Sequence, residues 1–116
     1  MFNKTTKFKQ KPSVISRAMS VTIFDETNQP NKIDLREFNK NVITFGRNDD
    51  NDIVINSPIV GRNHGHFKIQ GEQCLIEDLN STNGIILNDK SIKNHILSHG
   101  DLIRIDDRVE TIIVYL

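Results

Sequence analysis

The sequence predicts an all-β fold, a sandwich or barrel of roughly eleven short strands. Short apolar or alternating runs recur at close spacing and are separated by turn residues, which is typical of such folds. No window carries the i, i+3, i+4, i+7 apolar stripe that a core helix needs. All six glycines fall at expected strand ends or in connections, where positive φ or close backbone approach is often required.

The first half of the chain supplies four expected strands. In the first, apolar and polar residues alternate, as on a half-buried sheet, and the second places two aliphatic residues on one face. The third is β-branched and aromatic, and the fourth is short and apolar. These strands cover Met19–Phe24, Lys32–Glu37, Val42–Phe45 and Asp52–Ile55.

The second half continues as strands joined by short turns. Hairpin turns are expected at Gly71-Glu72 and at Asn88-Asp89-Lys90, and a further turn is expected near Asp106-Asp107. The strands beside these turns cover Phe67–Gln70, Cys74–Glu77, Ile85–Leu87, Ser91–Ile92, residues 102–105 and Thr111–Leu116.

At 116 residues the chain has the length of one domain. Its 15 basic and 15 acidic side chains cancel, which argues against a broadly basic nucleic-acid binder. Residues 1–18 nevertheless carry basic side chains and no acidic one. We therefore expect a flexible, solvated arm before a domain that spans residues 19–116. For the arm, contact with a membrane surface or a nucleic acid is the alternative; for the domain we expect neither partner.

Cys74 is the only cysteine in the sequence, so no disulfide can form within the chain, which favours a reducing compartment. A small buried core residue is favoured over a catalytic thiol. No apolar run approaches the ~20 residues of a transmembrane helix, and the N-terminus lacks the apolar segment of a secretory signal. We therefore expect a cytoplasmic protein.

Polar residues gather in three expected loops, and loops at one end of a sandwich often carry function. They hold two arginines, hydroxyls, carboxamides and backbone N–H groups but few carboxylates, a set that suits an oxyanion. No nucleophile elbow, phosphate-binding lysine loop or dinucleotide turn occurs. We therefore expect a binding module without a cofactor rather than an enzyme. The three loops contain Gly46-Arg47, Gly61–His64 and Asp78–Gly84.

Four motifs stand in a family order along the chain. They are Ile43–Arg47 with Asn51–Ile55, then Val60–Phe67, Asp78–Gly84 and Gly100–Ile103. The first resembles the opening of the forkhead-associated (FHA) pattern, and the others resemble its Ser-x-x-His, Asp-x-x-Ser-x-Asn-Gly and Gly-Asp-x-Ile segments. The resemblance runs from about residue 20 to the C-terminus. It implies an eleven-stranded β-sandwich that recognises phosphothreonine peptides through loops at one end.

The resemblance also implies a role for each matched residue. Arg47 would hold the phosphate, and Thr82 would add a hydroxyl bond and shape a pocket that prefers threonine to serine. Asn83 would fix the peptide backbone. The loop-bracing residues would be His64, Gly46 and Gly84. The partner would be a phosphothreonine-containing protein or peptide, a substrate of a Ser/Thr kinase.

Position 61 departs from the family pattern, because Gly61 stands where a serine hydroxyl would donate to the phosphate. A hydrogen bond to a charged group contributes about 1.5–3 kcal/mol, so its loss would lower affinity about ten- to a hundredfold. We expect the backbone N–H of Gly61 to be accessible to the phosphate, and the adjacent Arg62 to add a second guanidinium. The alternative function is an FHA-fold interaction scaffold that binds its partner independently of phosphate.

Simpler interpretations exist for the main contact residues. Arg47 could be a surface charge at a strand end, and Thr82 and Asn83 could only form a turn, since Asn-Gly favours tight turns. The residues alone do not choose Asn83 over Asn80.

Two groups of residues raise the question of a metal. His64 and His66 could face one way on a strand and share an ion, but no third ligand lies at a recognisable spacing. The run from Asn48 to Asp52 is similar to a calcium loop but lacks its glycine and closing glutamate, so we expect a solvated turn.

Overall fold

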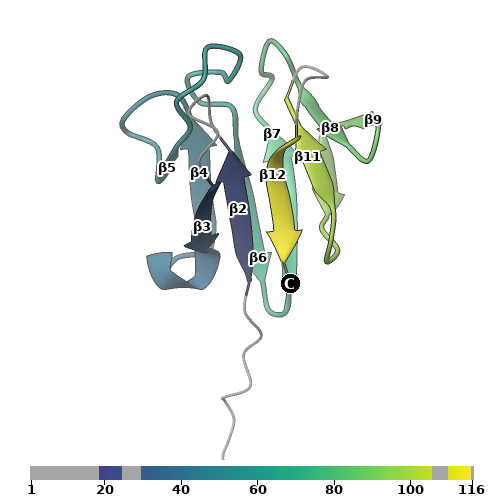
Figure 1. Ribbon diagram of the computed structural model, residues 1–116. Coiled ribbons are helices and arrows are strands. Elements are labelled where there is room, and N and C mark those ends of the chain that lie inside the picture. The colour runs from purple at the N-terminus through teal and green to yellow at the C-terminus, as the bar shows by residue number, and fades with distance from the viewer. Residues whose placement is uncertain (1–18, 25–29, 106–109, 116) are drawn as a thin grey trace, which may run out of the picture.

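The computed structural model describes residues 19–24, 30–105 and 110–115, and the side chains up to residue 105. Its strands form two sheets that pack face to face, as Figure 1 shows. The five-stranded sheet has the order β10-β7-β6-β4-β5, and the six-stranded sheet has the order β3-β2-β12-β11-β8-β9. The prediction of an all-β sandwich is confirmed.

The strand bounds define the two layers. The five-stranded sheet contains β4 (Val42–Gly46), β5 (Ile53–Val54), β6 (Gly65–Gln70), β7 (Gln73–Asp78) and β10 (Asn94–Ile96). The six-stranded sheet contains β2 (Ser20–Phe24), β3 (Pro30–Asp34), β8 (Ile85–Leu87), β9 (Lys90–Ile92), β11 (Leu102–Arg104) and β12 (Glu110–Tyr115). All described pairings are antiparallel except the parallel pairing of β4 with β5.

The core lies between the sheets and is built by alternation along each strand. Phe45 of β4 and Phe67 of β6 are fully buried, with ring centroids 5.1 Å apart. Cys74 is a buried core residue, as expected. Burial raises the pKa of its thiol to about 12, although the nearby Arg36 guanidinium opposes the shift. The thiol is therefore protonated and unreactive at neutral pH.

The expected strand Lys32–Glu37 is wrong in its second half. Strand β3 ends at Asp34, and Leu35–Phe38 form a single 3₁₀ turn. The Asp34 side chain caps this turn by accepting a bond from the Arg36 backbone N–H at 3.0 Å. Leu35 is buried within the turn, so its burial needs no strand. The sequence pattern did not distinguish burial of this leucine in a strand from burial in a 3₁₀ turn.

The other connections differ only in detail. The turn at Gly71-Glu72 lies between β6 and β7 as expected, with Gly71 at φ 62°. The second turn is shorter than expected, because β9 already begins at Lys90. Its two residues, Asn88 and Asp89, both have positive φ, as a type I′ hairpin turn requires. Strand β10 was not expected, since all three of its residues are exposed and it has no apolar alternation.

Three expectations fall outside the described residues. They are the flexible arm over residues 1–18, the turn near Asp106-Asp107 and the last residue of the final strand. Within the part of the chain that the structure describes, no helix is long and apolar enough to cross a membrane.

Gly65 offers a test of how tightly the five-stranded sheet is packed. A methyl group on Gly65 would overlap the backbone oxygen of Glu77 and lie 2.9 Å from the Phe45 ring. We therefore predict that Gly65→Ala lowers the unfolding free energy by about 1–3 kcal/mol, as measured by urea denaturation. Gln70→Ala, at the exposed end of the same strand, serves as the control and should change stability by less than about 0.5 kcal/mol. Equal stability of the two variants would contradict the prediction.

Candidate functional site

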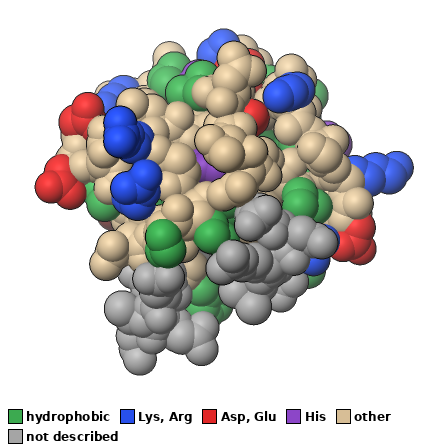
Figure 2. Space-filling model, turned by 90° about the horizontal axis from the view of Figure 1, so that it is seen from above, with side chains coloured by type: hydrophobic (Ala, Val, Ile, Leu, Met, Phe, Trp, Pro, Cys, Tyr) green, Lys and Arg blue, Asp and Glu red, His purple; other side chains and the backbone are tan. Residues whose placement is uncertain are grey.

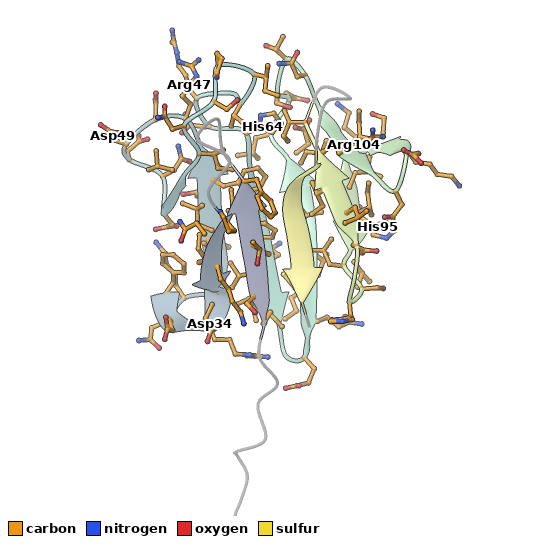
Figure 3. The ribbon with its side chains drawn as sticks, in the orientation of Figure 1. Asp34, Arg47, Asp49, His64, His95 and Arg104 are labelled. Carbon is orange, nitrogen blue, oxygen red and sulfur yellow. The ribbon has the colours of Figure 1, made fainter. Side chains whose placement is uncertain are left out.

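Three loops meet at one end of the sandwich, and we call them the site loops. They are residues 47–52 between β4 and β5, residues 55–64 between β5 and β6, and residues 79–84 between β7 and β8. Figure 3 shows Arg47 at the tip of this end, with His64 beneath the loops and Asp34 at the opposite end. Figure 2 looks onto the same end and shows a largely polar face, with basic side chains at its left next to acidic ones and further basic side chains at its top and right.

Backbone hydrogen bonds join the first two site loops side by side. The Arg47 N–H donates to the Gly61 carbonyl at 2.9 Å, and the Asn48 N–H donates to the Arg62 carbonyl at 3.1 Å. The buried side chain of Asn51 adds a donor to the same Arg62 carbonyl at 2.7 Å. These bonds set Arg47 and Arg62 on neighbouring segments.

Gly46 makes this close pairing possible. A methyl group at position 46 would overlap the Arg62 carbonyl oxygen and lie 2.8 Å from the Asn51 amide nitrogen. The Gly46 carbonyl also accepts a bond from the Ile55 N–H at 2.8 Å. The glycine therefore supports the loops through its lack of a side chain.

His64 connects the second site loop to the third. Its side chain is fully buried and stacks on the Phe45 ring, with centroids 5.9 Å apart. Its Nδ1 atom accepts a bond from the Gly61 N–H at 2.8 Å, so Nε2 carries the proton and donates to the Gly84 carbonyl at 2.8 Å. Neutral imidazole thus joins both loops, which is the geometry that a bracing role needs.

The third loop is held by its own side chains. The Ser81 hydroxyl donates to the Asp78 carboxylate and accepts a bond from the Gly84 N–H at 2.9 Å. Gly84 has φ 74°, a conformation that other residues rarely adopt. The Asn83 amide reaches across to the second loop and donates to the Ile59 carbonyl at 2.7 Å. The three loops therefore form one cross-linked platform.

Asp78 lies below this platform with its side chain almost fully buried. Its second carboxylate oxygen has no hydrogen-bond partner among the described residues, and the Lys93 ammonium is 3.8 Å away. Its first oxygen is 3.9 Å from His64 Nε2. This carboxylate faces the protein interior, so it does not lie on the outer face of the loops with Arg47 and Arg62.

The outward side chains are those that bind anions well. Arg47, Arg62 and Thr82 are all exposed. Arg47 uses its Nε atom to donate to the Val60 carbonyl at 3.0 Å, which orients the rest of its guanidinium outward. In the described part of the chain, neither arginine forms an ion pair with a carboxylate. A fixed guanidinium beside a second arginine and a hydroxyl can hold a phosphate through charge-assisted bonds.

The expectation for Gly61 is wrong in one respect. Its backbone N–H is not accessible to a ligand, because it already donates to His64 Nδ1. The brace that the fold requires uses the donor that was expected to serve the phosphate. Gly61 is not among the glycines with positive φ, so its backbone conformation is open to other residues.

The solvated turn expected from Asn48 to Asp52 is confirmed for Asp49 and Asp50, which are exposed, and wrong for Asn51 and Asp52. Asn51 is 8% exposed, and its side-chain amide donates to the Asn48 carbonyl within the same loop and to the Arg62 carbonyl in the second loop. The Asp52 carboxylate accepts bonds from the Thr44 backbone at 2.9 Å and from Lys40 Nζ at 2.6 Å. Burial opposes ionisation of Asp52, but these bonds outweigh it and lower the pKa of the carboxyl. The end of this loop is therefore fixed to β4 by hydrogen bonds.

The two histidines considered for a metal have separate partners. His64 is engaged by Gly61 and Gly84, whereas His66 lies on β6 and bonds to Glu77 at 2.5 Å. The hydrogen bond from His66 lowers the pKa of Glu77. Within the described residues, no three His, Cys, Asp or Glu side chains are grouped as metal ligands.

Sequence reasoning missed two residues of the platform. Asn51 and Ser81 stand inside matched motifs, so their positions were visible, but no role was assigned to them. Asn51 follows two exposed aspartates, and the sequence therefore predicts that it belongs to a polar turn. Ser81 belongs to an Asp-x-x-Ser pattern, and that spacing was the signal for its bond to Asp78.

His64 yields a prediction about pH. Burial lowers its pKa below the usual 6.5, although the Gly84 carbonyl and the Asp78 carboxylate oppose the shift. The unfolded chain therefore takes up this proton first, and stability that is complete above about pH 6.5 falls as the pH drops below it. His64→Ala should lose about 1–3 kcal/mol at pH 7.5, because two bonded groups lose their partner, and should lose this pH dependence.

Urea denaturation of both proteins between pH 7.5 and 5 tests the prediction. A variant as stable as the wild type, or one that keeps the full pH dependence, would show that His64 does not brace the loops.

Comparison with known proteins places this geometry in a family. The FHA domain model matches residues 43–106. The glycogen accumulation regulator GarA of Mycolicibacterium smegmatis is 32% identical over 60 residues, which are 52% of this chain and 38% of GarA. The chain therefore spans well under half the length of this relative.

Solved structures extend the likeness over most of the chain. One, from a study of phosphothreonine-dependent FHA domain interactions, has a TM-score of 0.70 and 25% identity, and covers 86% of this chain and 97% of its own. EmbR of Mycobacterium tuberculosis, in complex with a low affinity phosphopeptide, has a TM-score of 0.63 and 28% identity. This match covers 83% of the present chain and 24% of the EmbR chain. The family match spans more than half of the sequence and contains all three site loops. The chain belongs to the FHA domain family.

Proposed function

We propose that this domain binds a protein segment that contains phosphothreonine, through the outer face of the site loops. The observation that carries the proposal is Arg47, an exposed guanidinium that is fixed through Nε and lies beside a second arginine. Among the described residues, neither arginine has a carboxylate partner. A phosphothreonine carries about −1.5 to −2 charge at pH 7. It is the kind of ligand that balances these charges.

Thr82 and Asn83 complete the proposed contacts. Thr82 is exposed on the third loop and offers a hydroxyl to the phosphate and a methyl group to the phosphothreonine side chain. Asn83 is held through its bond to the Ile59 carbonyl, and its carboxamide oxygen is left to accept from a peptide N–H. Because Asn83 bridges two loops, the peptide backbone would be held at their junction.

Likeness to proteins of known binding supports the proposal. EmbR was solved with a phosphopeptide, and a closely similar fold was studied for phosphothreonine-dependent interactions. For this chain we propose a binding role without catalysis. The partner class is a cytoplasmic substrate of a Ser/Thr kinase, since such kinases produce phosphothreonine.

The function is tested with a degenerate peptide pool built around a central phosphothreonine and with the same pool unphosphorylated. Titration of the full chain should show binding to the phosphorylated pool only. Equal binding of both pools would favour the alternative, an interaction scaffold that is independent of phosphate.

Arg47→Ala should reduce phosphopeptide affinity by at least about a hundredfold, since it removes a charge-assisted pair of bonds to the phosphate. The fold should remain, because the side chain is exposed. Isothermal titration and a thermal melt measure the two effects. Lys32→Ala, which removes an exposed positive charge from the edge strand β3, is the matched control and should bind like the wild type. Unchanged affinity of Arg47→Ala would remove this residue from the site.

A further inference from the structure

Strand β10 is an unprotected edge of the five-stranded sheet. Among the described strands, β10 and β5 form the edges of this sheet, and β3 and β9 form the edges of the other. Natural sheets guard their edges with proline, lysine or very short strands, because an open edge pairs with other chains. Strand β3 begins with Pro30 and contains Lys32, β9 begins with Lys90, and β5 has only two residues. Strand β10 contains no proline, lysine or acidic residue and is exposed throughout.

The pairing with β7 leaves the backbone of Asn94 and Ile96 directed away from the sheet. The Lys93 carbonyl and the Leu97 N–H, on either side of β10, both bond to β7 at 2.8 Å. Every second residue of an antiparallel pair bonds to the partner strand, so His95 is the bonded residue within β10. The N–H and C=O groups of Asn94 and Ile96 therefore point outward, where a further strand can bond to them.

An apolar row on the outer face of this sheet ends at β10. Residues that are paired across neighbouring strands share a face of the sheet. Val42 is paired with Lys68, Lys68 with Leu75, and Leu75 with Ile96. Ile96, at the end of this row, is 50% exposed. A strand added at this edge would therefore cover apolar surface as well as form backbone bonds.

The sequence of β10 is compatible with a second copy of itself. Two antiparallel copies centred on His95 would place Asn94 opposite Ile96 of the other copy, twice, and form four backbone bonds. Lys93 would lie opposite Leu97, so no lysine or carboxylate would face one of its own kind. The two Ile96 side chains would be diagonal neighbours on the outer face, about 7–8 Å apart. The whole chain has no formal net charge, so two copies do not repel each other at long range.

We propose that β10 joins two copies of this chain edge to edge, so that their five-stranded sheets become one continuous sheet about a two-fold axis. Because the two strands run antiparallel, the site loops of the two copies lie at opposite ends of the dimer. Figure 3 shows His95 on the side of the sandwich, away from the end that carries Arg47. Both binding faces therefore stay open, and the dimer does not depend on phosphate binding.

Sedimentation velocity of the full chain tests the proposal. A three-residue edge buries less surface than the roughly 1,200–2,000 Å² of stable interfaces, so we expect a dissociation constant of about 10 µM to 1 mM. Asn94→Pro should raise this constant at least about tenfold, because it removes one donor from each copy. This N–H takes no part in the pairing with β7, so the monomer should keep its fold in a thermal melt.

A second variant keeps the test independent of the proline. Ile96→Lys removes the apolar contact and brings two lysines together across the edge, so the dissociation constant should again rise at least about tenfold. Ser91→Lys is the matched control, because Ser91 is exposed on the edge strand β9 of the other sheet. This control should dimerise like the wild type.

His95→Cys tests the register of the pairing. Residues that face each other in a non-hydrogen-bonded pair have Cα atoms about 4.5 Å apart, which a disulfide can span. With oxidised glutathione as the oxidant, His95→Cys should therefore form a disulfide-linked dimer, whereas Ser91→Cys should not. The native Cys74 is buried and does not compete.

Three results would overturn the proposal. The first is a wild type that stays monomeric at about 1 mM, the weak end of the expected range. The second is a dimer that survives Asn94→Pro and Ile96→Lys, because the copies would then meet elsewhere. The third is a His95→Cys variant that cross-links no better than Ser91→Cys. Loss of the dimer in folded Asn94→Pro or Ile96→Lys, together with the selective cross-link, would support it.

Discussion

The buried imidazole of His64 is the interaction on which the binding face depends. It contacts no solvent, yet both ring nitrogens are bonded, one to the N–H of Gly61 and the other to the carbonyl of Gly84. The second site loop is anchored in the core by Ile55 and Val60, but its link to the third loop is polar, and buried polar groups must be paired to be tolerated. One neutral ring meets both needs, and it stacks on Phe45, which belongs to the core. The loop geometry is therefore tied to the packing of the sandwich.

The sequence predicted the fold class and most strands because alternation reports burial directly. It failed where burial and strand formation separate. Leu35 is buried in a 3₁₀ turn that Asp34 caps, and strand β10 is exposed along its whole length and pairs with β7. At Leu35 an apolar residue is buried outside a strand, and at β10 a strand forms without alternating apolar residues. Edge pairing depends on backbone groups that every residue carries, so composition does not reveal it.

The candidate site divides in a similar way. Arg47 and Thr82 could be chosen because their side chains suit an oxyanion, whereas Asn83 could be chosen over Asn80 only through the family resemblance. The commitment of the Gly61 N–H to His64 could not, since it depends on the distance between two loops rather than on residue type. Asn51 is the same kind of case. The sequence predicts a solvated carboxamide here, because its neighbours are aspartates. The Asn51 side chain is buried instead, because the Arg62 carbonyl approaches over Gly46 and accepts a hydrogen bond from it.

The bonds to the Arg62 carbonyl also bear on how this arginine could bind an anion. A flexible side chain loses conformational entropy when it binds, so an arginine on a mobile loop would bind an anion weakly. Here the entropy of the backbone has already been lost on folding, because Asn48 and Asn51 hold the Arg62 carbonyl and the absence of a side chain at Gly46 admits it. Two guanidiniums on one rim repel each other weakly in water, and an anion between them relieves that repulsion. Gly46 leaves room for the Arg62 carbonyl, and it therefore brings together the two arginines of the proposed phosphate site.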